Sequence, residues 1–433
     1  MSVSTSRRSE LGVAGELERL LTPIVKGSLP VHLTAWDGST AGPDDAPRVV
    51  LRSRNALRRL LWNPGELGAA QAYVTGELDV EGDLDAALTH VWRVVADRGL
   101  STVSLTPTRI RELISTAWSL GAIGKPLPAP RSQARLRGRL HSLNRDRAAI
   151  SHHYDLSNEF YALILDDTMA YSSAYFTSDA VGYTIGDAQR DKLDLVCRKL
   201  GLDARPDMRF LDVGCGWGSL SLHAAEHFGA RVVGVTLSRE QKSFIDARIA
   251  ERGLGDRVEI RVQDYREVPD PPFDAVGSIE MGEHVGQQNY STYARVLRDK
   301  VIPYGRVLIQ QMSRTAGNHP GGGPFIESFI APDMFMRPVG ETVAMIEEAG
   351  LEVRDVHALR EHYVWTVDAW YATFSDHWDE VVAMVGEEVA RVWRLYLVGG
   401  RMAFRDGRMG VDQILAVRPD AQGRSQMPAV RGV

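Results

Sequence analysis

The stretch Phe210–Gly218, with the sequence FLDVGCGWG, constrains the fold more than any other part of the chain. Its short apolar run leads into three glycines spaced G-x-G-x-G, and Ser219–Phe228 then has the pattern of a helix. A buried strand that turns through glycines into a helix brings backbone N–H groups close to a ligand. The stretch therefore predicts a nucleotide-type α/β fold with a ligand at this turn, although a purely structural turn would have the same pattern.

The details of this turn favour S-adenosylmethionine (SAM) over a nicotinamide dinucleotide. The glycine spacing is one residue shorter than the dinucleotide pattern G-x-G-x-x-G. The next strand, residues 231–238, ends without the Asp or Glu that an NAD site places on the ribose, and offers Thr236, Glu240 and Gln241 instead. Asp212, in the first strand, can bind the ammonium group of an amino acid, which NAD lacks. An NAD oxidoreductase is therefore disfavoured.

Strand and helix patterns alternate over the middle of the chain. After the two strands named above, further strands are expected at 258–264, 273–280 and 305–312, and helices at 239–252 and 290–300. This alternation predicts an α/β fold with a doubly wound, mostly parallel, Rossmann-like sheet and a ligand at the carboxyl ends of its strands. Asp264 closes the third strand, where its carboxylate can accept a hydrogen bond from an adenine amino group.

Composition limits the class of protein. A chain of 433 residues, 44% of them hydrophobic, is long enough for two or three domains with a substantial core. The net charge of −6 argues against nucleic acid as a partner. Two cysteines make no disulfide framework and indicate a reducing cytoplasm. Without a signal peptide or a run of about eighteen apolar residues, we expect a cytoplasmic protein, peripherally associated with the inner face of the cell membrane.

Four regions follow one another along the chain. Residues 1–100 are expected to form a smaller α+β domain, 101–150 an amphipathic helix with a basic linker, 151–420 the catalytic domain, and 421–433 a flexible tail. The first region carries no cluster of catalytic residue types. It therefore fits a lipid-docking module or an oligomerisation module, the latter as a homodimer.

The second region combines an apolar helix face with positive charge. Thr106 and Pro107 resemble a helix start, and 110–123 has apolar residues at helical spacing. Six arginines follow between 131 and 147, opposed only by Asp146. An amphipathic helix beside such a cluster suits an anionic bilayer surface. A solvated linker whose arginines pair with acidic parts of the chain is the alternative, and the residues leave both open.

The last third of the chain is markedly apolar. Residues 321–336 form a glycine-led insertion rich in Phe, Ile and Met, and 363–396 are rich in aromatic side chains at helical spacing. Most of these aromatic residues are expected in the core. A minority are expected to line an apolar channel, which a long-chain substrate requires.

Several sequence blocks are specific when taken together. They are Ser151–Tyr161, Met169–Phe176, Leu211–Gly218, Gly234–Gln241, Gln263–Arg266, Met281–Gly286, His362–Trp370 and Val392–Leu397. With Ala72–Asp83 in the first region, these blocks closely resemble the cyclopropane-fatty-acyl-phospholipid synthase family over nearly the whole chain. The resemblance implies a class I SAM-dependent methyltransferase that adds one carbon to a cis double bond in an acyl chain of a membrane phospholipid.

The resemblance also implies which residues hold SAM. Those with a family counterpart are Tyr154, Tyr171 and Ser172 at the lid, Gly214 and Gly216 on the methionine side, Thr236 and Gln241 on the ribose side, and Asp264 at the adenine. Asp212 joins them on the argument given above.

The base that removes a proton is the second part of the implied site. In cyclopropane synthases it is understood to be a bound bicarbonate, held by a Glu, a His, a Tyr and the backbone near a Cys. The resemblance places Glu283 at the Glu and Tyr363 at the Tyr, whereas Gln310 stands at the His and Ser173 at the Cys. His284, in the same block as Glu283, completes the candidate catalytic residues, and no metal is expected.

Gln310 changes the product that we expect. An amide is a neutral donor, whereas a protonated imidazole is cationic, so bicarbonate would be held more weakly. If proton loss is delayed, a hydride shifts first, and proton loss from the new methyl group then leaves an exocyclic methylene instead of a ring. The tuberculostearic acid methyltransferases of this family form such a product, which a separate reductase saturates. We therefore expect a methylene-branched acyl chain, with a cyclopropane ring as the alternative.

Two further classes are alternatives. A small-molecule methyltransferase would share the glycine turn, but would need neither the apolar insertion after Gly323 nor the basic run before Ser151. A non-catalytic lipid-binding protein is disfavoured because Asp212, Glu283 and Tyr363 stand at positions that the chemistry requires.

Overall fold

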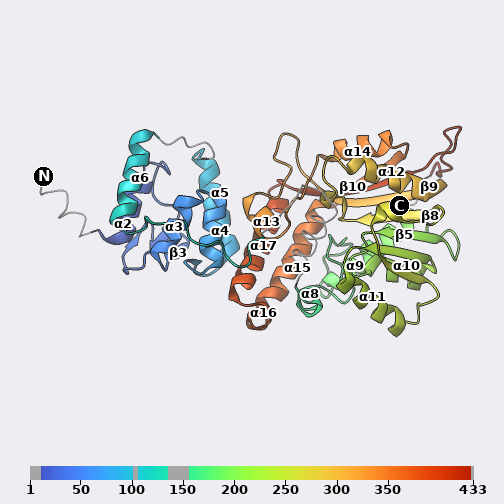
Figure 1. Cartoon of the computed structure of the whole chain (residues 1–433), viewed down its shortest axis with the longest axis horizontal. Coiled ribbons are helices and arrows are strands. Elements are labelled where there is room, and N and C mark those ends of the chain that lie inside the picture. Colours follow the sequence, from blue (N-terminus) through green and yellow to red (C-terminus); the bar gives the residue numbers. More distant parts are fainter. Residues whose placement is uncertain (1–10, 101–105, 135–155, 431–433) are drawn as a thin grey trace, which may run out of the picture. The chain divides into compact units, whose positions relative to one another are not determined.

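The computed structural model describes residues 11–100, 106–134 and 156–430. These residues form two compact units (Figure 1). The smaller unit contains the described residues up to 133 together with 385–402, and the larger unit contains those from 134 to 384 and from 403 onward. The linear boundaries expected from the sequence assign 385–402 to the catalytic domain.

The larger unit is built on a seven-stranded sheet with the order β10-β11-β9-β8-β5-β6-β7. Its strands are β5 (Arg209–Val213), β6 (Arg231–Thr236), β7 (Val258–Val262), β8 (Phe273–Ile279), β9 (Val301–Ser313), β10 (Glu352–Ala358) and β11 (Gly410–Val417). Strands β5 to β9 are parallel, and β11 and β10 add an antiparallel edge beyond β9. The prediction of a doubly wound, mostly parallel sheet is confirmed.

The order in which successive strands are added to the sheet reverses at β5. Strands β6 and β7 lie on one side of β5, and β8 and β9 lie on the other. Parallel α/β sheets bind ligands in the crevice at the carboxyl end of the strand where the order reverses. The glycine turn follows β5 directly, so the topology places it at this crevice.

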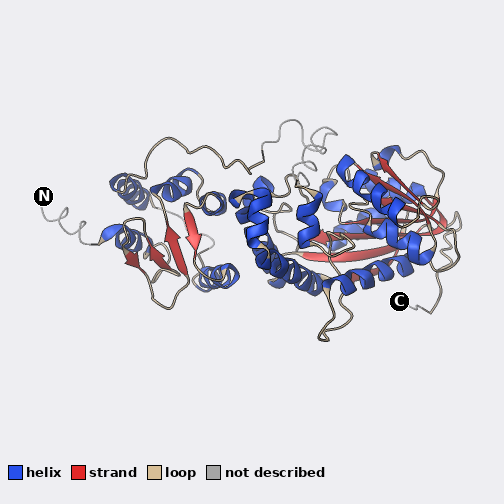
Figure 2. Ribbon diagram, turned by 90° about the horizontal axis from the view of Figure 1, so that it is seen from below, coloured by secondary structure: helices blue, strands red, loops and turns tan. Residues whose placement is uncertain are grey.

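Helices cover both faces of the sheet (Figure 2). The larger unit contains α8 (Asn158–Ile164), α9 (Ile185–Leu200), α10 (Ser219–Phe228), α11 (Arg239–Glu251), α12 (Tyr290–Lys300), α13 (Pro324–Phe329), α14 (Val339–Glu348), α15 (Arg360–Asp376) and α16 (Trp378–Val385). Phe210 packs in the core beneath α9, α10 and α11, whereas Leu211 packs in the core beneath α12 and α14. Successive strand residues point to opposite faces, which explains why the β5 sequence is apolar at both positions.

The antiparallel edge and the helix within the predicted apolar insertion were not expected from sequence patterns. β11 pairs with β9 over its whole length, and neither β11 nor β10 was expected as a strand. The insertion at 321–336 contains helix α13, and its Phe325 and Phe329 side chains are buried in the larger unit. None of the helices described here combines the length and the apolar character needed to cross a bilayer.

The smaller unit is a four-stranded sheet with surrounding helices. Its elements are α2 (Gly12–Leu21), β1 (His32–Thr34), β2 (Thr40–Ala41), β3 (Arg48–Leu51), α3 (Arg54–Trp62), α4 (Glu66–Val74), β4 (Leu78–Val80), α5 (Leu84–Asp97) and α6 (Pro107–Ser119). The strand order is β2-β1-β3-β4. The predicted helix start is confirmed at α6, where the Thr106 side chain accepts a hydrogen bond from the Arg109 backbone N–H.

A late segment of the chain completes the smaller unit. It is the first part of α17 (Glu387–Arg405), in which the Arg391 side chain is buried. Arg391 donates to the backbone oxygen of Tyr73 at 2.7 Å and to Asp79 Oδ1 at 2.9 Å, and its guanidinium lies 4.3 Å from the centre of the Tyr73 ring. A buried arginine with a carboxylate, a carbonyl and an aromatic face around it ties the segment to residues more than 300 positions earlier.

Replacing this arginine should destabilise the smaller unit. Arg391→Met keeps the aliphatic stem but leaves Asp79 and the Tyr73 carbonyl without this donor, which should cost about 3 kcal/mol, as for a broken buried ion pair. Urea denaturation followed by tryptophan fluorescence measures the loss. Glu387→Gln removes only the exposed ion pair that Glu387 makes with Arg391 at 3.6 Å, and as the control it should change stability by less than about 0.5 kcal/mol. An Arg391→Met protein that unfolds at the wild-type urea concentration would contradict this assignment.

Candidate active site

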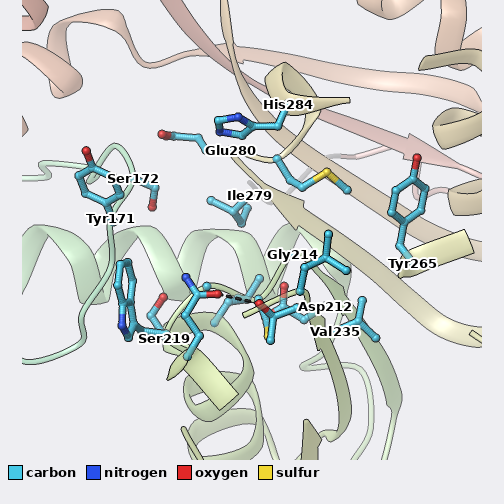
Figure 3. Close-up of a pocket in the computed structure, with 18 of the residues that line it drawn as sticks. Tyr171, Ser172, Asp212, Gly214, Ser219, Val235, Tyr265, Ile279, Glu280 and His284 are labelled. Carbon is cyan, nitrogen blue, oxygen red and sulfur yellow. Dashed lines mark hydrogen bonds between the residues drawn. The ribbon is translucent and has the colours of Figure 1, made fainter. Parts of the chain in front are cut away.

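A pocket opens in the larger unit at the carboxyl ends of β5, β6, β7 and β8 (Figure 3). It contains about 1270 Å³ of empty space, its open mouth included, so it is large enough for a small-molecule ligand. Most of the predicted SAM-site residues line it, namely Tyr171, Ser172, Asp212, Gly214, Gly216, Thr236, Gln241 and Asp264. Tyr154 lies outside the described residues.

The glycine turn forms the floor of this pocket. Gly214, Gly216 and Gly218 have φ angles of 77°, 53° and 83°, which lie in the left-handed region. A Cβ atom at Gly214 would lie 2.8 Å from the Met281 side chain, and one at Gly218 would lie 2.9 Å from Ile245. The turn therefore needs glycine for both its backbone angles and its close packing.

Two charged groups are buried beside the turn. Asp212 accepts a hydrogen bond from the Ser221 hydroxyl at 2.7 Å. Burial raises the pKa of Asp212 to about 6, while that hydrogen bond and the charge of Lys192 partly oppose the shift. Lys192 donates to the Ser172 hydroxyl at 2.8 Å, and burial lowers the pKa of Lys192 to about 8. Sequence analysis missed Lys192, whose only signal is a lysine among the inward positions of α9.

Polar side chains follow the next two strands. Thr236 donates to the Gln241 side-chain oxygen at 2.7 Å, which fixes the amide after β6. After β7, Asp264 is buried and accepts hydrogen bonds from Arg266 Nε at 2.8 Å and from its terminal nitrogen at 2.6 Å. The structure thus brings Thr236, Gln241 and Asp264 to one edge of the sheet. Their assignment to ribose and adenine stays a prediction.

The wall across from the turn carries Tyr171 and Ser172. Figure 3 shows Glu280 and His284 on one side of the pocket and Asp212 and Gly214 on the opposite side. The Tyr171 ring centre lies 5.3 Å from that of the buried Trp370. An aromatic wall of this kind keeps water away from that side of the pocket.

Glu280 directly follows β8 and lies at the centre of a second polar cluster at the pocket wall. One carboxylate oxygen accepts hydrogen bonds from the Ser173 backbone N–H at 2.8 Å and from Gln310 Nε2 at 2.9 Å. The other accepts a hydrogen bond from the Tyr363 hydroxyl at 2.7 Å. Three of the predicted catalytic residues therefore meet, but at a carboxylate that sequence analysis did not choose. Its one signal was its place at the end of a predicted strand.

Glu283 lies apart from this cluster. It belongs to the short helix η2 (Gly282–His284), is fully buried, and accepts a hydrogen bond from the Met312 backbone N–H at 2.9 Å. Burial, together with the charge of Glu280, raises the pKa of Glu283 to about 8. No described hydrogen bond joins its carboxylate to Ser173, Gln310 or Tyr363, and the residues around it that line the pocket are Met281, His284 and Val285. A direct part for Glu283 in the chemistry stays a prediction.

Comparison with known proteins identifies the family. Residues 141–414 match the family model of mycolic acid cyclopropane synthetase. The chain belongs to this family. It is 36% identical over 411 residues to a probable fatty acid methyltransferase of Mycobacterium tuberculosis, covering 93% of this chain and 94% of the relative. It is 33% identical over 405 residues to a tuberculostearic acid methyltransferase of the same organism, covering 90% and 88%.

A solved structure shows the same catalytic fold. The mycolic acid cyclopropane synthase in complex with S-adenosylhomocysteine (SAH) and CTAB is 31% identical, with a TM-score of 0.58 over 62% of this chain and 97% of the other. The predicted class I methyltransferase fold and the use of SAM are thereby confirmed. Nothing in these comparisons supports bicarbonate as the base.

The pocket residues fit SAM. The glycine turn leaves open space at Gly216, Asp212 supplies a buried carboxylate, and Gln241 and Asp264 supply amide and carboxylate groups at successive strand ends. When bound, SAM supplies an electrophilic methyl group on a sulfonium. The residues of this chain bind and orient it, and their burial excludes the water that would compete for it.

The raised pKa of Asp212 should make SAM binding depend on pH. Below pH 6 the free protein holds a proton on Asp212, and a bound ammonium group would expel that proton because it favours the carboxylate. SAM affinity should therefore fall by up to about tenfold per pH unit below 6, and binding at about pH 5 should release close to one proton. Calorimetry in buffers of different ionisation enthalpy measures both quantities.

Two variants test the origin of this pH dependence. Asp212→Asn should bind SAM without proton release, whereas Asp246→Asn, at an exposed position of α11, should behave like the wild type. Undiminished proton release in Asp212→Asn would show that another group is responsible.

Proposed function

We propose that this protein transfers a methyl group from SAM to a cis double bond in an acyl chain of a membrane phospholipid and forms a methylene-branched acyl chain. The observation that carries the proposal is the cluster of Glu280, Gln310 and Tyr363 at the wall of the SAM pocket, where a positive charge on carbon would lie close to a carboxylate and an aromatic ring. Similarity to the tuberculostearic acid methyltransferase over most of both chains supports the choice of product.

The proposed reaction balances in three steps. The π electrons of the alkene form the new bond to the methyl carbon, the carbon–sulfur bond breaks with its electrons on sulfur, and the neighbouring alkene carbon becomes cationic. A hydride then moves from the methylated carbon to that neighbour. Loss of a proton from the methyl group turns its C–H electrons into an exocyclic double bond.

Gln310 supports the methylene product over the ring. A ring forms when the methyl group loses its proton before the hydride moves. Gln310 is a fully buried neutral amide whose oxygen accepts a hydrogen bond from Gln413 at 3.0 Å and whose nitrogen donates to Glu280. The three hydrogen bonds that the Glu280 carboxylate accepts oppose the rise in its pKa that burial causes, and the slower proton loss that this favours would leave time for the shift. A separate reductase would then saturate the product.

Labelled lipid distinguishes the two products. A bacterium that makes neither product expresses this chain and is fed an acyl chain with deuterium on both alkene carbons. The hydride shift should gather both deuterium atoms on one carbon next to an exocyclic methylene, which nuclear magnetic resonance of the lipid detects. A cyclopropane with one deuterium on each of the two ring carbons that come from the alkene would reject the proposal. Methylation of water-soluble amines or alcohols, with no change in the lipids, would favour a small-molecule methyltransferase.

We also propose that α6 contacts the membrane surface. Its Ile110, Ile114 and Trp118 recur every four residues on one face, and they are 44%, 52% and 74% exposed. Thr116 and Ala117, on another face of the helix, are buried in the smaller unit. An apolar helix face turned to solvent suits the interfacial region of a bilayer. The basic run 135–147 lies outside the described residues.

Vesicle binding tests this contact. The double variant Ile114→Ser with Trp118→Ser should bind vesicles of anionic phospholipid at least about tenfold more weakly, because burial of each such side chain is worth about 1.5–3 kcal/mol. Co-sedimentation measures the binding. Ser115→Ala, at an exposed position of the same helix, is the matched control. Equal binding by the double variant and the control would remove α6 from the contact.

A further inference from the structure

The donors that the family resemblance assigns to a bound anion are already in use in this chain. Of the four positions that the resemblance assigns to bicarbonate, Glu283 lies apart, and the other three are the Ser173 backbone, the Gln310 side chain and Tyr363. All three donate hydrogen bonds to the Glu280 carboxylate, at 2.8, 2.9 and 2.7 Å. The position expected for a diffusible anion is therefore filled by a side chain of the protein.

A carboxylate is a close chemical match for bicarbonate. Each is a planar group with two oxygens that share one negative charge, so the same donors satisfy either. Both cannot be present, because two like charges in a buried site repel strongly. The nearby buried Lys192 has electrostatic interactions with Glu280, Asp166 and Asp212, so carboxylates of the protein already balance its positive charge.

We propose that Glu280 is the proton acceptor of the reaction and takes the place of a bound bicarbonate. This inference rests on the function proposed above. In the last step the C–H electrons of the transferred methyl group form the new carbon–carbon bond, and the proton passes to a Glu280 oxygen. The neutral acid then returns the proton to solvent after product release. Glu280 is only partly buried and lines the pocket, so its carboxylate is accessible from the side where substrate would lie.

The backbone at Glu280 supports a role for its side chain. Its φ angle is 48°, in the left-handed region that favours glycine, and its N–H donates to the Gln310 backbone oxygen at 2.6 Å. A residue with a Cβ atom in that conformation costs about 1 kcal/mol or more, and such strain is retained chiefly at functional sites. Burial raises the pKa of Glu280, while the hydrogen bonds from Ser173, Gln310 and Tyr363 oppose that shift and favour the ionised form that can accept a proton.

Two substitutions separate the carboxylate from the space that it fills. Glu280→Gln keeps the shape but cannot accept the proton, and Glu280→Gly empties the position at a backbone angle that suits glycine. In bicarbonate-free buffer the wild type should keep its full rate of lipid methylation, and both variants should lose about 100-fold or more. Millimolar bicarbonate should restore the Glu280→Gly rate by about tenfold or more, and should leave Glu280→Gln unchanged because the amide blocks the position. Glu259→Gln, an exposed glutamate on β7, is the matched control and should match the wild type.

A binding measurement tests the position without any turnover. Carbon-13 bicarbonate, followed by line broadening, should bind Glu280→Gly and should bind neither the wild type nor Glu280→Gln, while all three proteins bind SAM in calorimetry. If the wild type methylates no lipid but these binding results hold, the proposed function fails and the assignment of the anion position stands.

Several results would overturn the inference. They are a wild-type rate that falls when bicarbonate is removed, bicarbonate binding by the wild type, a Glu280→Gln variant with the wild-type rate, and a Glu280→Gly variant that binds SAM but no bicarbonate. If Glu280→Gly fails to fold, the Glu280→Gln rate and the bicarbonate dependence of the wild type decide.

Discussion

The Glu280 carboxylate joins parts of the larger unit that are far apart in the sequence. It receives hydrogen bonds from the segment around Ser173, from β9 through Gln310 and from α15 through Tyr363. Gln413, on the antiparallel strand β11, in turn holds the Gln310 amide. Because these groups come from different elements, this part of the pocket wall forms only when β8, β9, β11 and α15 are all in place. Site and fold are therefore one cooperative structure.

Buried charge at this pocket is balanced by neighbouring charge and by hydrogen bonds. Lys192 lies in the fields of Asp212 and Glu280, and all three line the pocket. Burying any one of these charges alone would cost free energy of desolvation, and the opposite charges beside it offset part of that cost. Glu283 is a third acid in this region, and its pKa is raised by burial and by the charge of Glu280. Such an arrangement lowers folding stability but fixes charged groups in place before a ligand binds, as is common in binding and catalytic sites.

The strongly periodic parts of the sequence were predicted well. Helices α10 and α12 have the expected bounds, and the parallel strands lie within a few residues of their expected positions, because their apolar patterns repeat at helical or strand spacing. The edge strand β10 was missed because its residues are only partly buried and mix charged with apolar types. Strand β11 was missed because its place beside β9 depends on pairing across about a hundred residues and not on local pattern.

The cluster around Glu280 shows which part of the site could not be predicted from the sequence. Positions 173, 310 and 363 could be chosen from family motifs, and the structure brings them together. The acid that they meet could not, since two glutamates lie three residues apart. The left-handed backbone at Glu280 and the short helix η2 after it determine that Glu280 reaches the cluster while Glu283 turns toward Met312. Neither feature has a sequence signal of its own.

The division of α17 between the two units has a consequence for how this protein could have arisen. The smaller unit is assembled from two separate stretches of chain, and the second stretch is continuous with Phe404, whose ring stacks on Tyr363 in the larger unit. A gene that joined a free-standing module to the front of a methyltransferase would not give this arrangement by simple fusion. The methyltransferase chain must also have gained, or already carried, a helix of which the greater part packs in the smaller unit. An insertion or deletion in α17 would therefore alter residues that pack in the smaller unit and residues that pack in the larger unit.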